Sequence, residues 1–398
     1  MASRTILYTG KGGVGKTSVA TATARRCAAA GARTIVLSTD PAHSLSDALE
    51  QRVGSEPTPA GDRLWAQQVS AQEEMERNWA SVQDWMGDML VERGVDRISA
   101  EELTVPPGAD ELFSLLALRA HHESDEYDVV VVDCAPTGET LRLLSFPDVA
   151  RWWLEKVFPQ QGRILDAARP FARAVLDVQL PGDEVLGDVQ RFVESLIAMH
   201  EILRDRERVS LRLVMNPDRM VIDEARRTFT YLNLYGFLTD AVVVNRVFPE
   251  EVGSYFAAWR EAQARALEEV EAAFAPVPVL RAPYFDREVR GAEMLDQLGA
   301  ALFDGRDAGD VLHSAFAHGL VVGRDGASLR LPLPFAEKGE LQLKKVGEEL
   351  VVRVGAHKRT ILLPPALSGY RPSGARFDDG EVLVISFDAP VEAVADPA

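Results

Sequence analysis

Short runs of apolar residues recur along the first three quarters of the chain, each followed by a turn or a polar residue. They cover residues 5–9, 34–39, 128–132, 211–215, 241–244 and 277–280. These runs are too short for helices and too continuous for half-exposed strands, so they predict strands covered on both faces. Stretches with helical periodicity separate them, and this alternation predicts an α/β fold with a mostly parallel sheet.

Two intervals between these runs are longer than one crossover helix requires. They predict helical insertions at about residues 49–126 and 147–208. Apolar residues recur at helical spacing within them, in stripes made of Trp79, Val82, Met86, Met89 and Leu90, of Leu112, Leu115, Leu116 and Leu118, and of Leu165, Ala168, Phe171, Ala172, Val175 and Leu176. Two interpretations stay open. The stripes are ordinary core, which is the more frequent outcome, or the insertions jointly expose an apolar surface for a partner helix.

The pattern changes near residues 304–310, where glycine and charged residues mark a boundary. Short strands separated by turn residues are expected beyond it, at 329–333, 341–344, 349–354, 359–364 and 382–387. They predict a small all-β sandwich of antiparallel strands. The chain is therefore expected to form two domains, residues 1–310 and residues 319–390.

Composition and charge narrow the classes of partner. The 398 residues carry a formal net charge of −18, from 43 basic and 61 acidic residues. No nucleic-acid partner is expected, because phosphate contacts draw on clustered Lys and Arg. No apolar run reaches the roughly 18 residues of a membrane span, and no signal peptide precedes the first strand, so we expect a cytoplasmic protein without direct membrane insertion. With only Cys27 and Cys134, a disulfide framework and a single-chain zinc site are excluded.

The strongest chemical signal lies in residues 10–18, which read Gly-Lys-Gly-Gly-Val-Gly-Lys-Thr-Ser. A G-x-x-x-x-G-K-[ST] motif between a strand and a helix forms a phosphate-binding loop, whose backbone N–H groups and helix dipole bind phosphate oxygens. The glycines permit the positive φ angles of such a loop, which we expect at Gly12, Gly13 and Gly15. Lys16 is expected at the outer phosphates and Thr17 at Mg²⁺, so ATP and Mg²⁺ are the expected cofactors. The residues assigned to nucleotide binding are Gly10, Lys11, Gly12, Gly13, Val14, Gly15, Lys16, Thr17 and Ser18.

Three further polar residues follow predicted strands, namely Asp40, Asp133 and Asn245. The carboxyl ends of parallel strands lie at the same edge of a sheet as the phosphate loop. Asp40 is therefore a candidate for orienting the attacking water, and Asp133 a candidate ligand of the metal shell. A helix cap at Asp40 and a turn residue at Asn245 are the alternatives.

The second lysine of the loop, Lys11, connects the chain to a known group of proteins. The string K-G-G-V-G-K-T resembles the deviant Walker A class of ATPases. The strings S-T-D-P-A-H-S-L-S-D-A (38–48) and A-P-T-G-E-T-L-R (135–142) resemble the two switches of the arsenite-pump (ArsA) and tail-anchored-protein-targeting (GET) ATPases, with Glu139 in place of the usual histidine. This resemblance covers roughly residues 3–305.

The resemblance implies a homodimer that encloses nucleotide, in which Lys11 crosses to the partner's phosphates, as an arginine finger does elsewhere. It also implies that Asn245 recognises adenine and that Glu224 lies near the nucleotide at the dimer seam. The C-terminal strands are similar to the α-crystallin domain of small heat-shock proteins, which implies binding of apolar segments or a passive role in packing.

We therefore expect a dimeric Mg²⁺-dependent ATPase with Asp40, Lys11 and Lys16 as catalytic residues. Its expected output is an apolar groove that binds a hydrophobic helix or membrane-protein client. An arsenite-efflux motor is an alternative, but it needs three soft thiolates, which two cysteines per chain supply only across subunits. A spatial organiser of the ParA or MinD type would need an amphipathic end, whereas residues 388–398 are anionic and interrupted by proline. A nitrogenase-like electron carrier needs four cysteines per cluster.

Overall fold

The computed structural model describes residues 3–40, 44–92, 94–97, 109–134 and 182–314, and in the C-terminal domain residues 319–322, 326–346, 349–355, 357–363, 367, 370–379 and 381–388. Several sequence-based expectations lie outside these ranges. They are residues 41–43 of the first switch string, the whole second switch string with Glu139, the apolar stripe at 165–176 and the acidic tail after residue 388.

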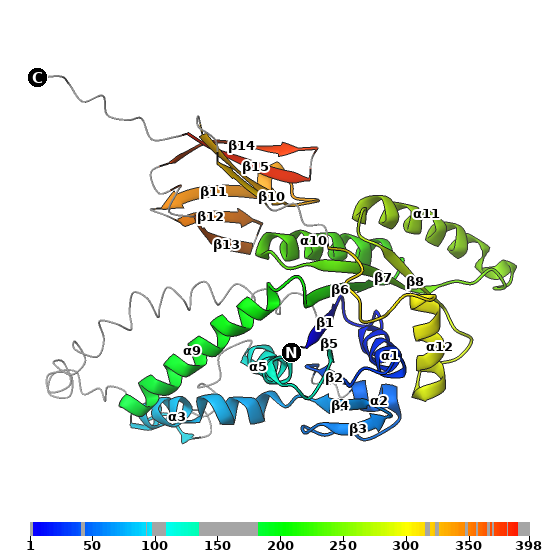
Figure 1. The fold of residues 1–398 in the computed structure, drawn as a ribbon, viewed down its shortest axis with the longest axis horizontal. Coiled ribbons are helices and arrows are strands. Elements are labelled where there is room, and N and C mark those ends of the chain that lie inside the picture. The colour runs from blue at the N-terminus through cyan, green and yellow to red at the C-terminus, as the bar shows by residue number, and fades with distance from the viewer. Residues whose placement is uncertain are drawn as a thin grey trace, which may run out of the picture.

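Eight strands form the central sheet (Figure 1). In spatial order they are β3 (Thr58–Gly61), β4 (Leu64–Gln68), β2 (Thr34–Ser38), β5 (Val129–Asp133), β1 (Arg4–Thr9), β6 (Val209–Met215), β7 (Thr239–Val247) and β8 (Val279–Pro283). All neighbouring strands pair in parallel except β3 and β4, which form an antiparallel hairpin at one edge. The mostly parallel sheet predicted from the apolar runs is confirmed.

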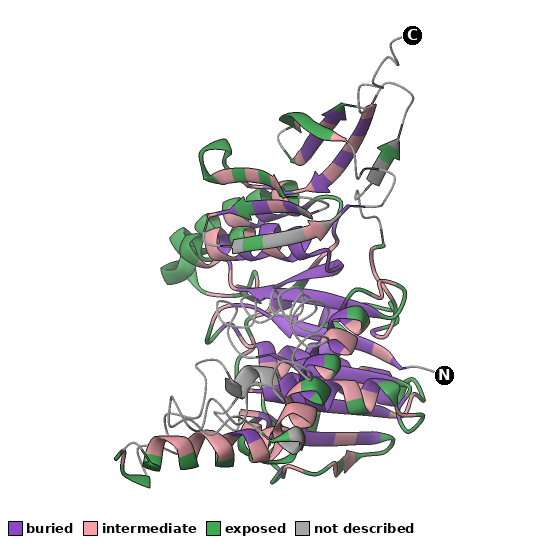
Figure 2. Cartoon of the chain, turned by 90° about the vertical axis from the view of Figure 1, so that its left-hand side faces the viewer, coloured by how far each residue is buried: buried purple, intermediate pink, exposed green. Residues whose placement is uncertain are grey.

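Helices cover both faces of this sheet, which is why its central strands are mostly apolar. On β1, Ile6 and Tyr8 pack toward one face and Leu7 toward the other. The first face carries α1 (Lys16–Ala29), α2 (Ser44–Leu49) and α12 (Gly291–Phe303). The second carries α5 (Ala109–Glu123), α9 (Asp183–Leu203), α10 (Arg219–Tyr235) and α11 (Ala257–Phe274), with α3 (Ala71–Glu92) packed on α5 and α9 and the short 3₁₀ helix η1 (Ser254–Phe256) before α11. The buried strands form the purple layer in the middle of Figure 2.

The insertion predicted at residues 49–126 is only partly helical. Its first part is the hairpin of β3 and β4, which extends the main sheet, and its helices begin at Ala71. The hairpin was missed because β3 holds a proline and a glycine, which argue against a central strand, but Pro59 lies on the edge strand, where proline is tolerated.

The helical part of this insertion packs on the apolar core at one face of the main sheet. Trp79 of α3, Phe113 of α5 and Phe192 of α9 meet at centroid distances of 4.9–6.5 Å. The side chains of Leu115, Leu116 and Leu118 on α5 are buried. For α5, the interpretation as ordinary core is therefore confirmed. None of the helices in the described ranges is long and apolar enough to span a bilayer.

Two antiparallel sheets form the C-terminal domain, as the strand pattern predicts. One has the order β14 (Arg371–Asp378), β15 (Val382–Asp388), β10 (Gly326–Pro332) and β9 (Gly319–Val322); the other has β11 (Leu341–Val346), β12 (Glu349–Val354) and β13 (His357–Leu362), preceded by the 3₁₀ helix η2 (Lys338–Glu340). Alternate residues of β10, β12 and β15 fill the core between them. Figure 1 shows this domain above α10, at the opposite end of the molecule from α3.

The segment that joins the two domains is tied to the main sheet. Arg212 of β6 donates from Nη1 to the carbonyl of Ala308 at 2.9 Å and from Nη2 to that of Asp310 at 3.0 Å. Arg4 donates from Nε to the carbonyl of Gly309 at 2.9 Å. Because the guanidinium groups of buried Arg212 and partly buried Arg4 bind these carbonyls, residues 308–310 within the predicted boundary are anchored to the main sheet. We call this segment the strap.

Candidate functional site

The loop between β1 and α1 lies directly on β6 and β7. A Cβ at Gly10 would lie 2.1 Å from the carbonyl oxygen of Val214, and one at Gly15 would lie 2.3 Å from Nδ2 of Asn245. Gly15 is also the N-cap of α1, with φ of 93°. These two positions therefore require glycine for both space and backbone angle. Positive φ, expected at three glycines of the loop, occurs at Gly13 and Gly15 but not at Gly12.

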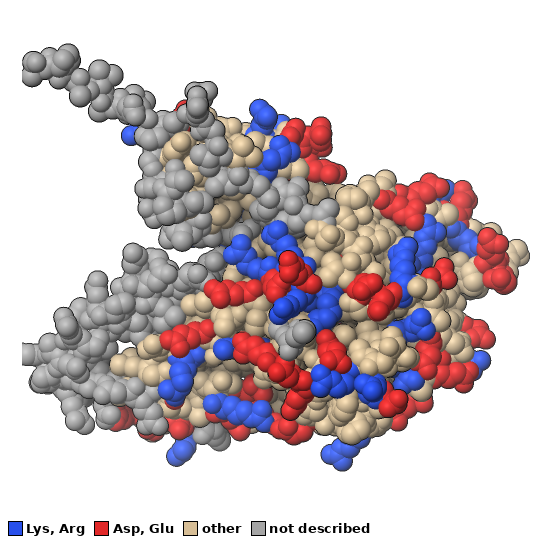
Figure 3. All heavy atoms as spheres, in the orientation of Figure 1, with Lys and Arg blue, Asp and Glu red and all other residues tan. Residues whose placement is uncertain are grey.

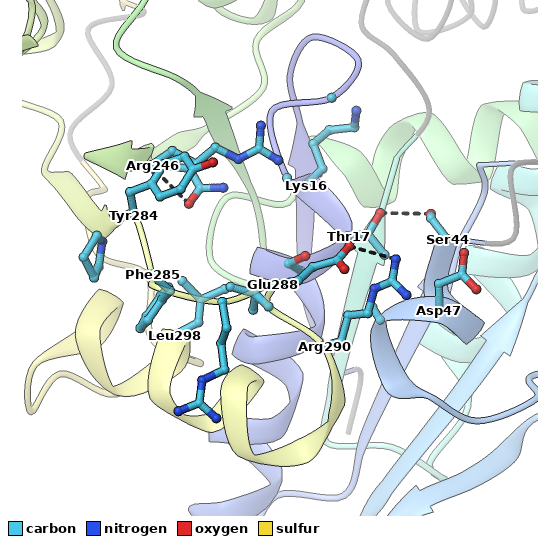
Figure 4. Close-up of a pocket in the computed structure, with 18 of the residues that line it drawn as sticks. Lys16, Thr17, Ser44, Asp47, Arg246, Tyr284, Phe285, Glu288, Arg290 and Leu298 are labelled. Atoms are coloured by element: carbon cyan, nitrogen blue, oxygen red, sulfur yellow. Dashed lines mark hydrogen bonds and ion pairs between the residues drawn. The ribbon is translucent and has the colours of Figure 1, made fainter. Parts of the chain in front are cut away.

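An open pocket of about 730 Å³ lies in front of this loop (Figure 4). Eight of the sequence-predicted site residues line it, namely Gly12, Gly13, Gly15, Lys16, Thr17, Ser18, Asp40 and Asn245. The first turn of α1 points into the pocket, so its N–H groups and positive dipole end favour an anion there. The phosphate loop, the end of β2 and the end of β7 thus meet at one edge of the sheet, as the parallel topology predicts.

Asp133, at the end of β5, is fully buried behind Thr17. The Thr17 hydroxyl donates to Oδ2 of Asp133 at 2.6 Å, and the Ser38 hydroxyl lies 3.5 Å from the same oxygen. Oδ1 of Asp133 has no hydrogen-bond partner in the described structure. Burial raises the pKa of Asp133 to about 6, although Thr17 and Lys16 oppose this shift.

This arrangement of oxygens fits a hard divalent cation. The hydroxyl oxygens of Thr17 and Ser44 lie 3.0 Å apart beside the carboxylate of Asp133. Mg²⁺ binds one or two carboxylates together with hydroxyl, water and phosphate oxygens. Thr17 and Asp133 are the residues of this arrangement that would hold magnesium, and metal binding by them stays a prediction.

Asp40 follows the carboxyl end of β2 and lines the same pocket. Its backbone is fixed on both sides, because its N–H donates to the Ser38 hydroxyl at 3.3 Å and its carbonyl accepts from Nε2 of Gln68 at 2.6 Å. The described part of α2 starts at Ser44, and residues 41–43 lie outside the described structure. The helix-cap alternative for Asp40 concerns those residues, so its role in orienting water stays a prediction.

Asn245 supports the phosphate loop. Its Nδ2 donates to the carbonyl of Val14 at 2.8 Å, and its Oδ1 accepts from the N–H of Arg246 at 2.9 Å. Val14 is a residue of this loop, and its side chain is buried. Asn245 also lines the pocket, so adenine recognition stays a prediction beside this structural contact.

Lys11 and Glu224 form an ion pair at the rim of the site. Nζ of Lys11 lies 3.3 Å from Oε2 of Glu224, and their side chains are 41% and 30% exposed. Lys11 does not line the pocket of its own chain. The structure thus brings together two residues that the resemblance places at a dimer seam.

Part of the pocket wall was not predicted from the sequence. The segment after β8 lines it from Pro283 to Arg290, and Arg246, Ser44 and Asp47 line it as well. Figure 4 shows Tyr284 and Phe285 across the pocket from Ser44 and Asp47. Tyr284 stacks on Phe248 at 5.5 Å, and Arg290 pairs with Glu288 at 2.7 Å. The signal that could have identified this wall is the strand-end rule, since β8 ends at the same edge of the sheet.

Comparison with known proteins identifies the family. A family model described as "Anion-transporting ATPase" matches residues 3–304, and one described as "HSP20-like domain found in ArsA" matches residues 324–387. The chain is 37% identical over 392 residues, 97% of this chain and 96% of the relative, to a protein of Prosthecochloris vibrioformis named "Putative arsenical pump-driving ATPase".

Two eukaryotic relatives match the larger domain. The chain is 30% identical over 310 residues, 75% of this chain and 90% of the relative, to "ATPase get3" of Aspergillus terreus. It is 28% identical over 301 residues, 73% of this chain and 90% of the relative, to "ATPase ASNA1 homolog 1" of Paramecium tetraurelia. The chain therefore belongs to the ArsA/GET family of nucleotide-binding, ATP-hydrolysing enzymes, with an HSP20-like domain at its C-terminal end.

Proposed function

We propose that two copies of this chain close around ATP, and that ATP binding and hydrolysis open and close an apolar surface for a hydrophobic segment of a client protein. Family membership establishes hydrolysis of ATP. The homodimer, the magnesium ion, the client and a cytoplasmic location are the parts that we propose.

The position of Lys11 is the observation that carries the proposal. Its ammonium group lies at the rim, beside Glu224 and outside the pocket of its own chain. A lysine in a phosphate loop that does not face its own phosphate site is placed to contact a second molecule. On the first turn of α10, Met220 is 76% exposed, an apolar side chain that a second copy would cover. Both features support closure of two chains over the nucleotide.

The chemistry within one chain follows from the pocket. Loop N–H groups and Lys16 bind the phosphates, and Thr17 and Asp133 hold the metal, which neutralises phosphate charge when it is bound. Asp40 orients a water molecule toward the γ-phosphorus. The new P–O bond forms as the bond to the β–γ bridging oxygen breaks, which gives ADP and phosphate. Lys11 must leave Glu224 to stabilise charge on the partner's phosphates.

The outer half of α3 supports an apolar client. Trp85, Met86, Met89 and Leu90 on this half are partly exposed, while Val82 is buried. Methionine and tryptophan suit a surface that binds varied apolar helices, because methionine is flexible and both side chains are polarizable. The outer half of the α3 stripe therefore differs from the stripe on α5, whose leucines are buried in the core.

The cysteines disfavour the motor of an arsenite pump. Burial raises the pKa of both Cys27 and Cys134 to about 12, so each stays protonated at neutral pH. A metalloid needs several accessible thiolates. In the described parts of the chain, no three His, Cys, Asp or Glu side chains form a group that could hold a metal ion.

The dimer is tested with Lys11→Ala. Wild-type specific activity is expected to rise with protein concentration as dimers form, and the variant is expected to lose roughly 10³-fold in turnover at every concentration, the scale of a lost arginine finger. Lys344→Ala, an exposed lysine on β11, is the matched control and should behave as wild type. Near-normal turnover of Lys11→Ala would refute the dimeric mechanism.

The client is tested with a labelled peptide of about 20 apolar residues, the length of a membrane span. Asp40→Asn protein with ATP should capture this peptide and release it when nucleotide is removed. Sodium arsenite is the second arm. Stimulation of wild-type ATPase by arsenite, without capture of the peptide, would replace the client with the pump role.

A further inference from the structure

One helix, α10, touches both the phosphate-loop lysine and the C-terminal sandwich. Its second turn carries Glu224, the partner of Lys11, and its last turns carry Tyr231 and Leu234, which pack into the sandwich core. An α-helix rises about 1.5 Å per residue, so these two regions lie roughly 15 Å apart on one stiff element. A shift of the sandwich relative to the main sheet therefore moves Glu224 as well.

The contact between α10 and the sandwich is buried and specific. Leu234 is fully buried among sandwich residues. The Thr230 hydroxyl donates to the carbonyl of Pro334, in the loop after β10. In Figure 1 the sandwich lies along α10 with β10 and β13 nearest to it, and both strands contact the helix.

Phe335, the next residue of this loop, is the anchor. Its ring packs on Phe229 of α10 at 6.3 Å and on Phe274 of α11 at 5.7 Å, and the guanidinium of Arg226 lies 5.5 Å from the ring centroid. Its φ of 66° is in the left-handed region, which is rare for a bulky residue. Such a backbone persists only where its surroundings hold it, and it is found most often at functional positions.

The strap that precedes the sandwich is bound to the ATPase domain, where Arg212 and Arg4 donate to the carbonyls of Ala308, Gly309 and Asp310. In the described structure, the loop after β10 and the strands β10 and β13 make the direct contacts between the sandwich and α10. A change in the position of the sandwich is therefore transmitted to α10 through these contacts.

We propose that Phe335 is a positioning residue of the ATPase, which holds α10 so that Glu224 retains Lys11 until a second copy arrives. This inference rests on the proposed role of Lys11. The HSP20-like domain thereby regulates closure of the dimer. Displacement of Phe335, for example when an apolar segment occupies the sandwich, frees Lys11 for the partner's phosphates.

The test measures, in the full-length protein, the protein concentration at which ATPase activity reaches half its maximum. Glu224→Gln is expected to lower this concentration about two- to fivefold, the range that a half-exposed ion pair supports. Phe335→Ala should lower it by a similar factor, because α10 is no longer fixed. The double variant should shift no further than either single variant, since both act on one contact. Phe335→Tyr, which keeps the ring, should restore the wild-type value.

Val346→Ala is the matched control, because Val346 lies on β11 and is 53% exposed. It should leave the half-maximal concentration unchanged. If Phe335→Ala fails to fold, Thr230→Val replaces it and should shift the value in the same direction by a smaller factor.

Two outcomes overturn the inference. One is a wild-type half-maximal concentration in Phe335→Ala, or in its replacement Thr230→Val, while Glu224→Gln shifts it. The other is full additivity of the two shifts in the double variant. Failure of the proposed function is distinguishable, because Lys11→Ala would then retain activity whatever happens at Phe335.

Discussion

Two aspartates of the main sheet, Asp133 on β5 and Asp240 on β7, are both completely buried, yet their surroundings differ. Asp240 lies near the start of its strand, where Oδ1 accepts from Arg212 at 3.1 Å and Oδ2 accepts from Arg4 at 3.2 Å. Asp133 lies at the opposite edge with one oxygen bonded to Thr17 and the other unpartnered in the described structure. We call the Asp240 carboxylate complete, because both of its oxygens have hydrogen-bond partners within the protein. We call the Asp133 carboxylate incomplete, because one of its oxygens is left for a ligand.

Most hydrogen-bonding groups of the cluster around Asp240 have partners within the protein. Arg212 donates to both oxygens of Asp240, to the Tyr8 hydroxyl and to the carbonyls of Ala308 and Asp310. Burial alone would lower the pKa of Arg212, but Tyr8 and Asp240 outweigh it and the pKa is raised. A fully bonded buried charge holds the fold together, while a partly bonded one marks a site.

Removing the complete carboxylate should have the largest effect. Asp240→Ala leaves the buried guanidinium of Arg212 and the partly buried guanidinium of Arg4 without their counter-ion. Breaking a buried ion pair costs about 3–5 kcal/mol. Chemical denaturation should therefore show a large loss in the free energy of unfolding, with the strap released. A loss below about 1 kcal/mol would mean that the carbonyls of the strap suffice for both arginines.

Replacing the incomplete carboxylate of Asp133 should stabilise the folded protein when nucleotide and metal are absent. Asp133 has a folded-state pKa of about 6, above an unfolded value of about 3.9. The wild type therefore loses stability as the pH rises between these two values, by about 3 kcal/mol in total. Asp133→Asn keeps an acceptor for Thr17 without this cost.

The variant should consequently unfold at a higher temperature than wild type at pH 8, and at a similar temperature near pH 4. Its ATPase activity should be lost, and magnesium with nucleotide should stabilise only the wild type. Equal melting curves at pH 8 would show that Asp133 is not strained by its burial.

A smaller effect is expected at the edge of the complete cluster. Tyr8→Phe removes the hydroxyl that accepts from Arg212 at 3.1 Å and contacts Thr23 at 2.6 Å. The loss of one acceptor for a buried donor costs about 1–3 kcal/mol. Double-mutant denaturation with Asp240→Ala should show strong non-additivity, and independent effects would separate Tyr8 from the cluster.

The smallest effect is expected for a charge pair at the surface. Arg25 and Asp296 are bonded at 2.7 Å, but Asp296 is 55% exposed. Asp296→Ala should change the free energy of unfolding by about 1 kcal/mol or less. Basic and acidic side chains are interspersed on the face shown in Figure 3, so neighbouring charges soften such losses further. If Asp296→Ala lowered the free energy of unfolding as much as Asp240→Ala does, burial would not be the cause of the difference between the two ion pairs.

Local pattern predicted much of the fold and part of the site. The apolar runs gave the central strands, because a strand covered on both faces can expose few polar side chains. The strand-end rule brought Asp40, Asp133 and the phosphate loop to one pocket. The same rule holds for β8, whose following segment from Pro283 to Arg290 forms a pocket wall that was not among the predicted site residues. The hairpin of β3 and β4 was missed because edge strands need not be continuously apolar.

The amino-acid sequence by itself determined which segments become buried strands, where the phosphate loop lies and which residue types face a nucleotide, because these depend on neighbours within a few positions. Only the tertiary structure decided that Lys11 pairs with Glu224, that Arg212 binds the carbonyls of the strap and that Phe335 packs on α10. Those contacts join residues about a hundred or more positions apart. Chain topology and packing of the two domains set such distances, and no local pattern encodes them.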